Sequence, residues 1–122
     1  ILELSSFQLM EMPISPQISV ITNVSPNHLD IHKSYEEYIE AKKNIFMTQD
    51  ENGIVVLNYD NEITNSFSDD VKGEVRFFST KSKLENGVIL EDSDIKIVTA
   101  GNKEVVININ EYKFIYRLKE EL

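Results

Sequence analysis

Short apolar runs divide the first half of the chain into predicted strands and helices. Three runs are typical of buried parallel strands: Ile1–Leu4, Ile18–Val24 and Ile54–Leu57. A short crossover helix is expected between the first two, over Ser6–Met12. From Ser34 the apolar residues recur with the helical period, which predicts a second helix that ends near residues 49–53. Strand, helix and strand in this order predict a parallel α/β arrangement.

The second helix begins with a capping signal and carries a lysine in its apolar face. Ser34 and Glu37 have the spacing of a capping box. Lys42 lies three or four positions from apolar residues on both sides, whereas Lys43 is expected to face solvent. Two interpretations of Lys42 remain open from the pattern. Either its stem packs while its charge reaches water, or it is a desolvated lysine in a site, whose uncharged amine can react.

The second half of the chain changes to closely spaced strands. A short helix is expected around Asn61–Phe67, and strands then follow at Val75–Phe78, Gly87–Leu90, Ile95–Thr99 and Val105–Ile109, with a hairpin turn over Ala100–Lys103. We expect antiparallel pairing from about Val75 to Phe114. The predicted fold class is therefore α/β. A mostly parallel sheet with crossover helices precedes a C-terminal antiparallel group, in a single partial domain over residues 1–122.

Charge and composition narrow the range of functions. The 122 residues include 12 Lys and Arg and 21 Asp and Glu, which gives a formal net charge of −9. This excess repels phosphate backbones and anionic lipids, so we expect no nucleic-acid and no membrane partner. No run of apolar residues approaches the roughly 20 of a spanning helix, and a cytoplasmic protein is expected. The first residue, Ile1, lies inside a predicted strand, which suggests a fragment of a longer protein.

Polar residues follow the first predicted strand. Glu3 is an acid within an apolar run, and as a buried carboxylate it would need a cation or hydrogen-bond donors. A hard divalent ion with oxygen ligands is one solution. The hydroxyls of Ser5 and Ser6 could belong to the same site, or they could cap the next helix.

A second polar segment follows the strand that ends at Val24. His28 and Asp30, two residues apart, could coordinate a metal ion, since imidazole is a common metal ligand. The alternative is a loop with turn hydrogen bonds in which both histidines, His28 and His32, are incidental. Because the carboxyl ends of parallel strands meet at one edge of a sheet, we expect these groups to lie near Glu3 and Lys42.

Together, these segments resemble the Mur ligases. The chain matches motifs of the central ATPase domain of that family in order and spacing: Glu3-Leu4-Ser5-Ser6-Phe7-Gln8-Leu9, then Asn23-Val24 with His28-Leu29-Asp30, then Tyr38 with Ala41-Lys42. The segment Leu57-Asn58-Tyr59-Asp60 resembles the Asn-x-Asp-Asp stretch of the family loosely. The first motif is similar to the form found in the D-glutamate-adding branch.

The resemblance implies an ATP-dependent carbon–nitrogen ligase of peptidoglycan synthesis. Its substrates would be ATP, UDP-N-acetylmuramoyl-L-alanine and D-glutamate. ATP would phosphorylate the alanyl carboxylate, and the D-glutamate amine would attack the acyl phosphate. By matching positions, Glu3 and His28 would bind Mg²⁺, and Lys42 would support this ion as a carbamate. Ser5 and Gln8 would contact the nucleotide-sugar substrate, and His28 and Lys42 would be the catalytic residues.

The chain also departs from the pattern of this family. It contains no Gly-rich phosphate-binding loop, and Tyr112–Leu122 lacks the Leu-Pro-Gly-x-His-Asn stretch. We therefore expect the chain alone to bind ATP weakly or not at all and to be inactive as a ligase. We also expect it to self-associate through an exposed sheet edge. The alternative function is a noncatalytic nucleotide- or protein-binding module of Mur ligase ancestry.

Overall fold

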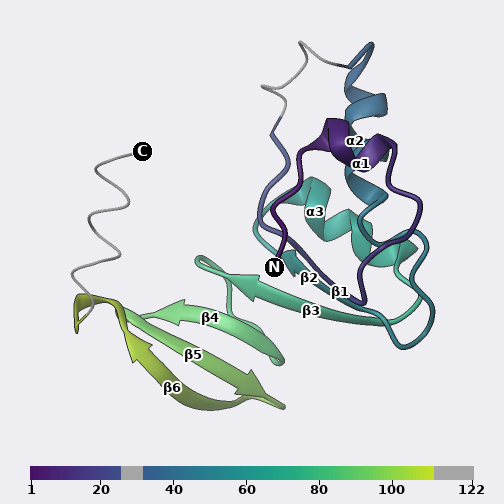
Figure 1. The fold of residues 1–122 in the computed structure, drawn as a ribbon. Coiled ribbons are helices and arrows are strands. Elements are labelled where there is room, and N and C mark those ends of the chain that lie inside the picture. Colours follow the sequence, from purple (N-terminus) through teal and green to yellow (C-terminus); the bar gives the residue numbers. More distant parts are fainter. Residues whose placement is uncertain (26–31, 112–122) are drawn as a thin grey trace. The chain divides into compact units, whose positions relative to one another are not determined.

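Two parallel strands organise the first part of the chain. Strand β1 (Ile18–Ile21) pairs with β2 (Ile54–Asn58), with Ile18 opposite Ile54, and helix α2 (Tyr35–Lys43) lies in the connection between them. The predicted parallel strand–helix–strand order is therefore confirmed. The structure is a computed structural model that describes residues 1–25 and 32–111, and the chain divides into two compact units between Arg76 and Phe77 (Figure 1).

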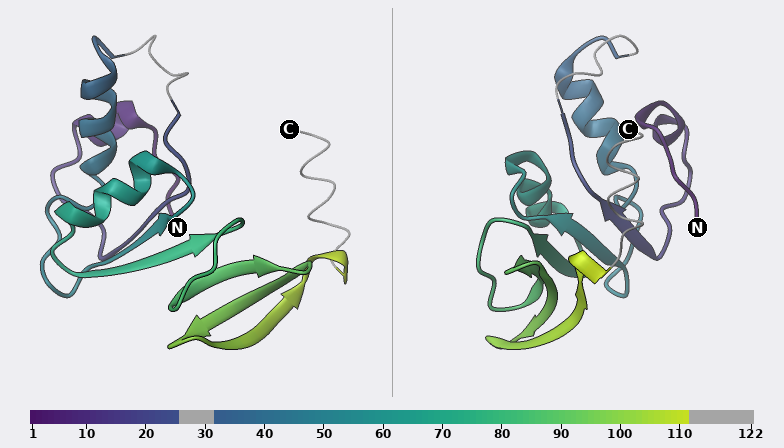
Figure 2. Two further views of the ribbon diagram at one scale, coloured as in Figure 1. Left: turned by 180° about the vertical axis from the view of Figure 1, so that it is seen from behind. Right: turned by 90° about the vertical axis from the view of Figure 1, so that its left-hand side faces the viewer.

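The core of the first unit lies between these strands and the helices. Helix α1 (Ser6–Met10) packs against α2, and α3 (Glu62–Ser66) with the 3₁₀ helix η1 (Phe67–Asp70) follows β2 (Figure 2). The fully buried side chains include Leu9, Val24, Val55, Leu57 and Phe67. The rings of Phe46 and Phe67 lie 5.9 Å apart and tilted, a geometry that aromatic pairs favour. The short helix predicted around Asn61–Phe67 is confirmed.

The predicted strand over Ile1–Leu4 is wrong. These four residues have no regular secondary structure, and Ile1 and Leu2 are exposed. A strand is stable only when a neighbour satisfies its backbone N–H and C=O groups. Among the described residues β1 pairs with β2 alone, and Ile1–Leu4 forms no backbone pairs with the free edge of β1.

Helix α2 begins where the sequence predicts, with half of the expected capping box. The Ser34 hydroxyl accepts a hydrogen bond from the Glu37 N–H group at 3.1 Å. The Glu37 carboxylate accepts from the Lys33 N–H group at 2.6 Å, one residue before the position that a capping box requires. Both bonds still satisfy free amides at the start of the helix.

The same helix ends at Lys43 rather than near residues 49–53. Two carbonyl groups just beyond it accept hydrogen bonds from serine hydroxyls of other segments, Asn44 from Ser15 and Ile45 from Ser19, both at 2.8 Å. These contacts draw the backbone into turns over residues 44–48. The sequence prediction failed here because the competing hydroxyls come from residues 26 to 29 positions away.

The second unit is an antiparallel group with one parallel neighbour. As predicted, its strands pair antiparallel in chain order: β4 (Gly87–Glu91) with β5 (Asp94–Thr99), and β5 with β6 (Asn102–Asn108). The end of β3 (Glu74–Ser79) instead pairs parallel to β4, which corrects the expectation of antiparallel pairing from Val75. Glycine at position 87 allows β4 to begin close to β3. Its φ of +138° suits glycine, and a Cβ there would lie 2.4 Å from the Phe77 carbonyl oxygen.

Two tight turns connect β4, β5 and β6. Asp92 and Ser93 have positive φ angles of 51° and 67°, and Ala100 and Gly101 have 48° and 78°. Two successive residues with positive φ match the twist of antiparallel strands. The turn predicted over Ala100–Lys103 is confirmed.

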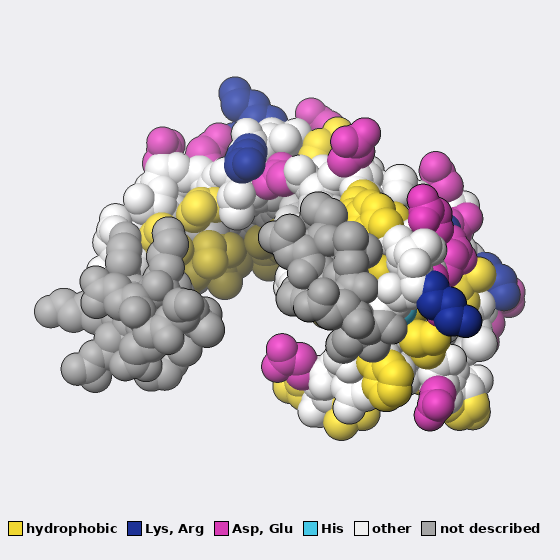
Figure 3. Space-filling model, turned by 90° about the horizontal axis from the view of Figure 1, so that it is seen from above, with side chains coloured by type: hydrophobic (Ala, Val, Ile, Leu, Met, Phe, Trp, Pro, Cys, Tyr) yellow, Lys and Arg dark blue, Asp and Glu magenta, His cyan; other side chains and the backbone are white. Residues whose placement is uncertain are grey.

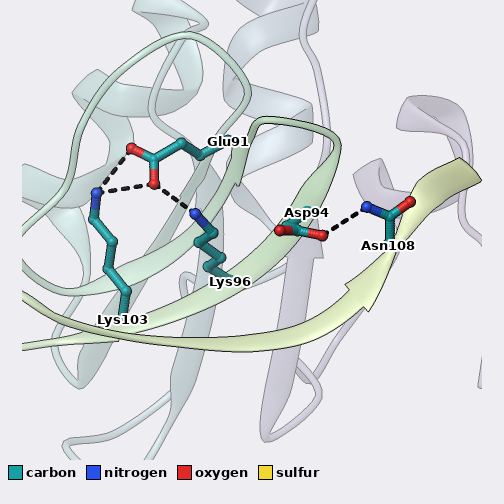
Figure 4. Close-up of polar contacts among 5 residues, drawn as sticks. All are labelled: Glu91, Asp94, Lys96, Lys103 and Asn108. Carbon is teal, nitrogen blue, oxygen red and sulfur yellow. Dashed lines mark hydrogen bonds and ion pairs between the residues drawn. The ribbon is translucent and has the colours of Figure 1, made fainter.

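An ion cluster links these three strands (Figure 4). The Glu91 carboxylate accepts from Lys96 Nζ at 2.7 Å and from Lys103 Nζ at 2.8 and 2.9 Å. The two ammonium groups hold the pKa of Glu91 at about 2, well below its usual 4.5. Nearby, Asn108 Nδ2 donates to Asp94 Oδ1 at 2.8 Å. These side-chain contacts join the strands in addition to their backbone pairing.

Acidic and apolar side chains share the surface of the described residues. Figure 3 shows Asp and Glu side chains at several places on one face, with Lys and Arg side chains between them rather than in one broad patch. On the antiparallel group, Val88 and Ile97 are exposed and lie opposite each other in register. Val105 and Val106 of β6 are also more than half exposed.

Candidate active site

A cavity of about 320 Å³ lies at the carboxyl end of β1. Glu3 and Lys42 both line it, together with Leu9, Asn23 and Ile45. Ligands of open α/β sheets bind outside the carboxyl ends of parallel strands. Two of the three residues that the family resemblance assigns to Mg²⁺ therefore line one cavity at that edge.

Lys42 is half-buried in this cavity and has no carboxylate partner among the described residues. No ion pair joins its ammonium group to any residue in 1–25 or 32–111, and its nearest charge-stabilising contact is the Tyr38 ring, 5.8 Å from Nζ to the ring centroid. Burial lowers the pKa of Lys42 below its ordinary 10.5. A larger fraction of this side chain is therefore the neutral amine, which is the nucleophilic form.

Lys43 does not face solvent as the sequence pattern suggested. Its side chain is 20% exposed and forms ion pairs with Asp70 at 2.9 Å and Glu40 at 3.1 Å. Its Nζ also lies 5.6 Å from the centre of the Phe67 ring. The hydrogen bond to Asp70 is the main cause of the raised pKa of Lys43. The pKa values of the two adjacent lysines thus shift in opposite directions, because among the described residues only Lys43 has carboxylate partners.

Glu3 lines the cavity but is not the buried carboxylate that the sequence suggested. It lies in the irregular segment before α1 and is exposed. The expected burial was inferred from a strand that does not form. An exposed carboxylate at a cavity wall keeps its oxygen atoms available to a ligand.

Ser5 and Gln8 form the N-terminal cap of α1. The Ser5 hydroxyl accepts from the Gln8 N–H group at 3.3 Å, and Gln8 Oε1 accepts from the Ser5 N–H group at 2.9 Å. This is a complete capping box, the role proposed for the serine hydroxyls as the alternative to a ligand site. Both residues are exposed, and neither lines the cavity with Glu3 and Lys42.

His28 and Asp30 lie outside the described residues, whereas His32 is described and is not incidental. His32 is 7% exposed, and its Nε2 atom lies 2.8 Å from the Ser6 hydroxyl of α1. Its ring also contacts that of Tyr38 on α2, at 5.4 Å between centroids. No local sequence pattern identifies this role of His32, because Ser6 is 26 positions away.

Asparagine side chains join the carboxyl ends of β1 and β2. Asn58 Nδ2 donates to the Thr22 carbonyl at 2.9 Å, and Asn61 Nδ2 donates to Asn23 Oδ1 at 2.6 Å and to the Val24 carbonyl at 3.2 Å. These amides continue the link between the two strands beyond their last backbone pair. Sequence reasoning noted the segment around Asn58 but missed Asn61.

The comparison with known families decides the assignment. A family model described as "Mur ligase middle domain" matches residues 1–119. The chain belongs to the Mur ligase family. Its mixed sheet with helices is consistent with that family.

Curated relatives of this Mur ligase chain carry the name UDP-N-acetylmuramoylalanine--D-glutamate ligase. The protein from Acetivibrio thermocellus is 53% identical over 88% of this chain and 23% of its own length. That from Ruminiclostridium cellulolyticum is 56% identical over 78% of this chain and 20% of its own length. That from Clostridium kluyveri is 59% identical over 80% and 21%. The chain thus spans between a fifth and a quarter of the length of these relatives.

Two features absent from the described residues of this Mur ligase chain are a cluster of metal-binding side chains and a membrane-spanning helix. Within residues 1–25 and 32–111, no three His, Cys, Asp or Glu side chains come together as a metal site. The predicted set consists of Glu3, Lys42 and His28, of which His28 lies outside those ranges. None of the described helices is both long and apolar enough to span a bilayer.

Proposed function

We propose that this chain is part of an ATP-dependent carbon–nitrogen ligase that adds D-glutamate to UDP-N-acetylmuramoyl-L-alanine in peptidoglycan synthesis. The cavity shared by Glu3 and Lys42 at the carboxyl end of β1 carries this proposal. Relatives that are 53–59% identical bear the name of that ligase. One family model covers residues 1–119, which supports treating the two units as parts of a single domain. We place the reaction in the cytoplasm.

The reaction requires that one carboxylate be activated before an amine attacks it. The carboxylate of the alanyl group takes the γ-phosphoryl group of ATP, and ADP leaves. The amine of D-glutamate then attacks the acyl phosphate, and inorganic phosphate and a proton leave as the amide forms. Phosphoryl transfer and acyl transfer both develop negative charge, so positioned charges and donors provide most of the catalysis.

The residues around the cavity fit a role in holding Mg²⁺. Glu3 offers carboxylate oxygens, and Lys42 has a lowered pKa without an ion-pair partner among the described residues. A neutral Lys42 amine can add to CO₂ and release a proton, which converts a disfavoured cation into a carbamate anion. Glu3, His28 and the Lys42 carbamate would then hold the ion. Mg²⁺ would neutralise phosphate charge during the transfer.

Ser5 and Gln8 would serve the nucleotide-sugar substrate from their position at the start of α1. Their capping box fixes both side chains to the backbone, so they would present a rigid polar surface. The Ser5 hydroxyl and the Gln8 amide group keep hydrogen-bonding capacity beyond the cap. His32 would support this surface, since it binds the adjacent Ser6.

An assay with one substrate omitted at a time tests the proposed function. The intact protein that contains this chain should release phosphate from ATP only when Mg²⁺, UDP-N-acetylmuramoyl-L-alanine and D-glutamate are all present. Replacement of D-glutamate by L-glutamate, L-lysine or D-alanine should abolish release. Binding of ATP without release under any combination would instead support the noncatalytic module.

A further inference from the structure

One side chain, Asn61, connects three segments at the edge of the candidate site. Asn61 precedes α3 as its N-cap, and its Oδ1 atom accepts from the Thr64 N–H group at 2.9 Å. Its Nδ2 atom donates to Asn23 Oδ1 at 2.6 Å and to the Val24 carbonyl at 3.2 Å. Asn23 in turn lines the cavity that contains Glu3 and Lys42.

The donors and acceptors around Asn61 fix the orientation of both amides. A backbone N–H group can only donate, so the Asn61 atom facing Thr64 is the oxygen. The Asn61 nitrogen therefore faces the Val24 carbonyl and Asn23. Because an N–H group needs an acceptor, the Asn23 atom that it meets is Oδ1. The Asn23 Nδ2 group is left with its two N–H donors, which no described residue accepts.

We propose that Asn61 is a positioning residue for the ligase reaction, and that it holds Asn23 with its amide donors toward an anionic oxygen of a substrate. This inference rests on the proposed function. The oxygen belongs either to the γ-phosphate of ATP or to the carboxylate that becomes phosphorylated. Both present a charged acceptor at the carboxyl end of β1, where Asn23 lies. An unrestrained Asn amide presents its oxygen to the cavity as easily as its nitrogen, and the Asn61 bond removes that alternative.

The expected effects follow from the strength of a hydrogen bond to a charged group. Such a bond contributes about 1.5–3 kcal/mol, so Asn23→Ala should lower kcat/KM by about 10- to 100-fold. Asn61→Ser keeps an N-cap oxygen for Thr64 but removes the donor to Asn23. The kcat/KM of this variant should fall less, by about 3- to 10-fold, because Asn23 then samples both amide orientations.

Asn65 provides a matched control on the same helix. Its Nδ2 atom donates to the Tyr59 carbonyl at 3.1 Å, and it does not line the cavity. Asn65→Ser therefore makes the same chemical change in α3 without touching Asn23, and kcat/KM should stay at the wild-type value. A similar thermal midpoint for the Asn61→Ser and Asn65→Ser proteins would show that loss of activity does not come from loss of folding.

The test is a double-mutant cycle in the intact ligase, with kcat/KM measured for ATP and for UDP-N-acetylmuramoyl-L-alanine. Asn61→Ser should reduce kcat/KM in the wild-type background and have no further effect in the Asn23→Ala background. A rise of KM confined to ATP would assign the oxygen to the γ-phosphate, and a rise confined to the other substrate would assign it to the carboxylate. Equal losses from Asn61→Ser in both backgrounds, or no loss in either, would overturn the positioning role while the ligase function stands. A wild-type protein without ligase activity would overturn both.

Discussion

Lys42 and Lys43 are neighbours on α2, yet replacing each with Met should affect different properties. Met retains an unbranched stem and a similar helix propensity, so the main change is loss of the ammonium group. Lys43→Met removes the ion pairs with Asp70 and Glu40 and the contact with the Phe67 ring. Partly exposed ion pairs contribute about 0.2–1 kcal/mol each, and an exposed cation–π contact about 0.5–1 kcal/mol. We expect Lys43→Met to lower the free energy of unfolding by about 1–2 kcal/mol.

Lys42→Met should leave stability nearly unchanged. The replacement loses the contact with the Tyr38 ring but also ends the burial of a charge without an ion-pair partner among the described residues. These effects oppose each other, so we expect a change within about 0.5 kcal/mol of zero. In the intact ligase the same replacement removes the amine that would become the carbamate. We expect kcat to fall by about 100-fold or more, since lost transition-state charge stabilisation has that size.

Urea unfolding followed by circular dichroism measures the first effect, and phosphate release measures the second. The slope of the unfolding free energy against urea should agree between the two variants, so that a shifted midpoint reports stability alone. Lys43→Met should shift the midpoint and retain most of the activity. Lys42→Met should leave the midpoint nearly unchanged and lose most of the activity. Equal destabilisation and equal loss of activity in both variants would refute the distinction, and Lys42 would then be an ordinary packed lysine.

Three further predictions follow from the described contacts. Because the pKa of Glu91 falls from 4.5 to about 2 on folding, its contribution to stability is present above pH 4.5 and is lost as the pH drops from 4.5 toward 2. The wild-type unfolding free energy should therefore fall more steeply over this interval than that of Glu91→Gln, and parallel curves would contradict the ion cluster. His32→Ala should lower the free energy of unfolding by about 2–3 kcal/mol, because the packing on Tyr38 and the hydrogen bond to Ser6 are lost. Adding Ser6→Ala should lower it little further if the two side chains act as a pair. In sedimentation velocity, the chain alone should self-associate increasingly as its concentration rises. Val106→Lys on the exposed strand β6 should reduce this self-association. A monomer at every concentration would rule the self-association out.

Local sequence signals predicted the elements that depend on nearby residues. Ser34 marks the start of α2, and the apolar run at Ile54 gives the buried strand β2. The turn at Ala100 and Gly101 also follows from its neighbours, since it joins two strands of alternating residues. In each case the sequence pattern that makes the prediction lies within a few positions along the chain.

The features that sequence reasoning missed depend on distant contacts. An apolar run such as Ile1–Leu4 becomes a strand only if it pairs with a neighbour, and in the described residues β1 pairs with β2 alone. The helical pattern places Lys43 toward solvent because it carries no information on Asp70, 27 positions later. Asn61 meets Asn23 across 38 positions, so no local pattern identifies it. Glu3 and Lys42 were expected near one edge of the sheet and both line the cavity, although Glu3 does not lie at the end of a strand.

Rescue of Lys42→Ala in the intact ligase by small carboxylates is the most direct test of the proposed site. If Lys42 acts as a carbamate beside Glu3, then formate or acetate can occupy the space left in the cavity and supply the missing negative charge. We predict that activity returns in a saturable manner with carboxylate concentration and that chloride at the same ionic strength has no effect. Lys43→Ala, which removes the ion pairs with Glu40 and Asp70, should show no such response. Activity that stays absent at every carboxylate concentration, in a folded Lys42→Ala protein, would contradict the carbamate and the site built around it.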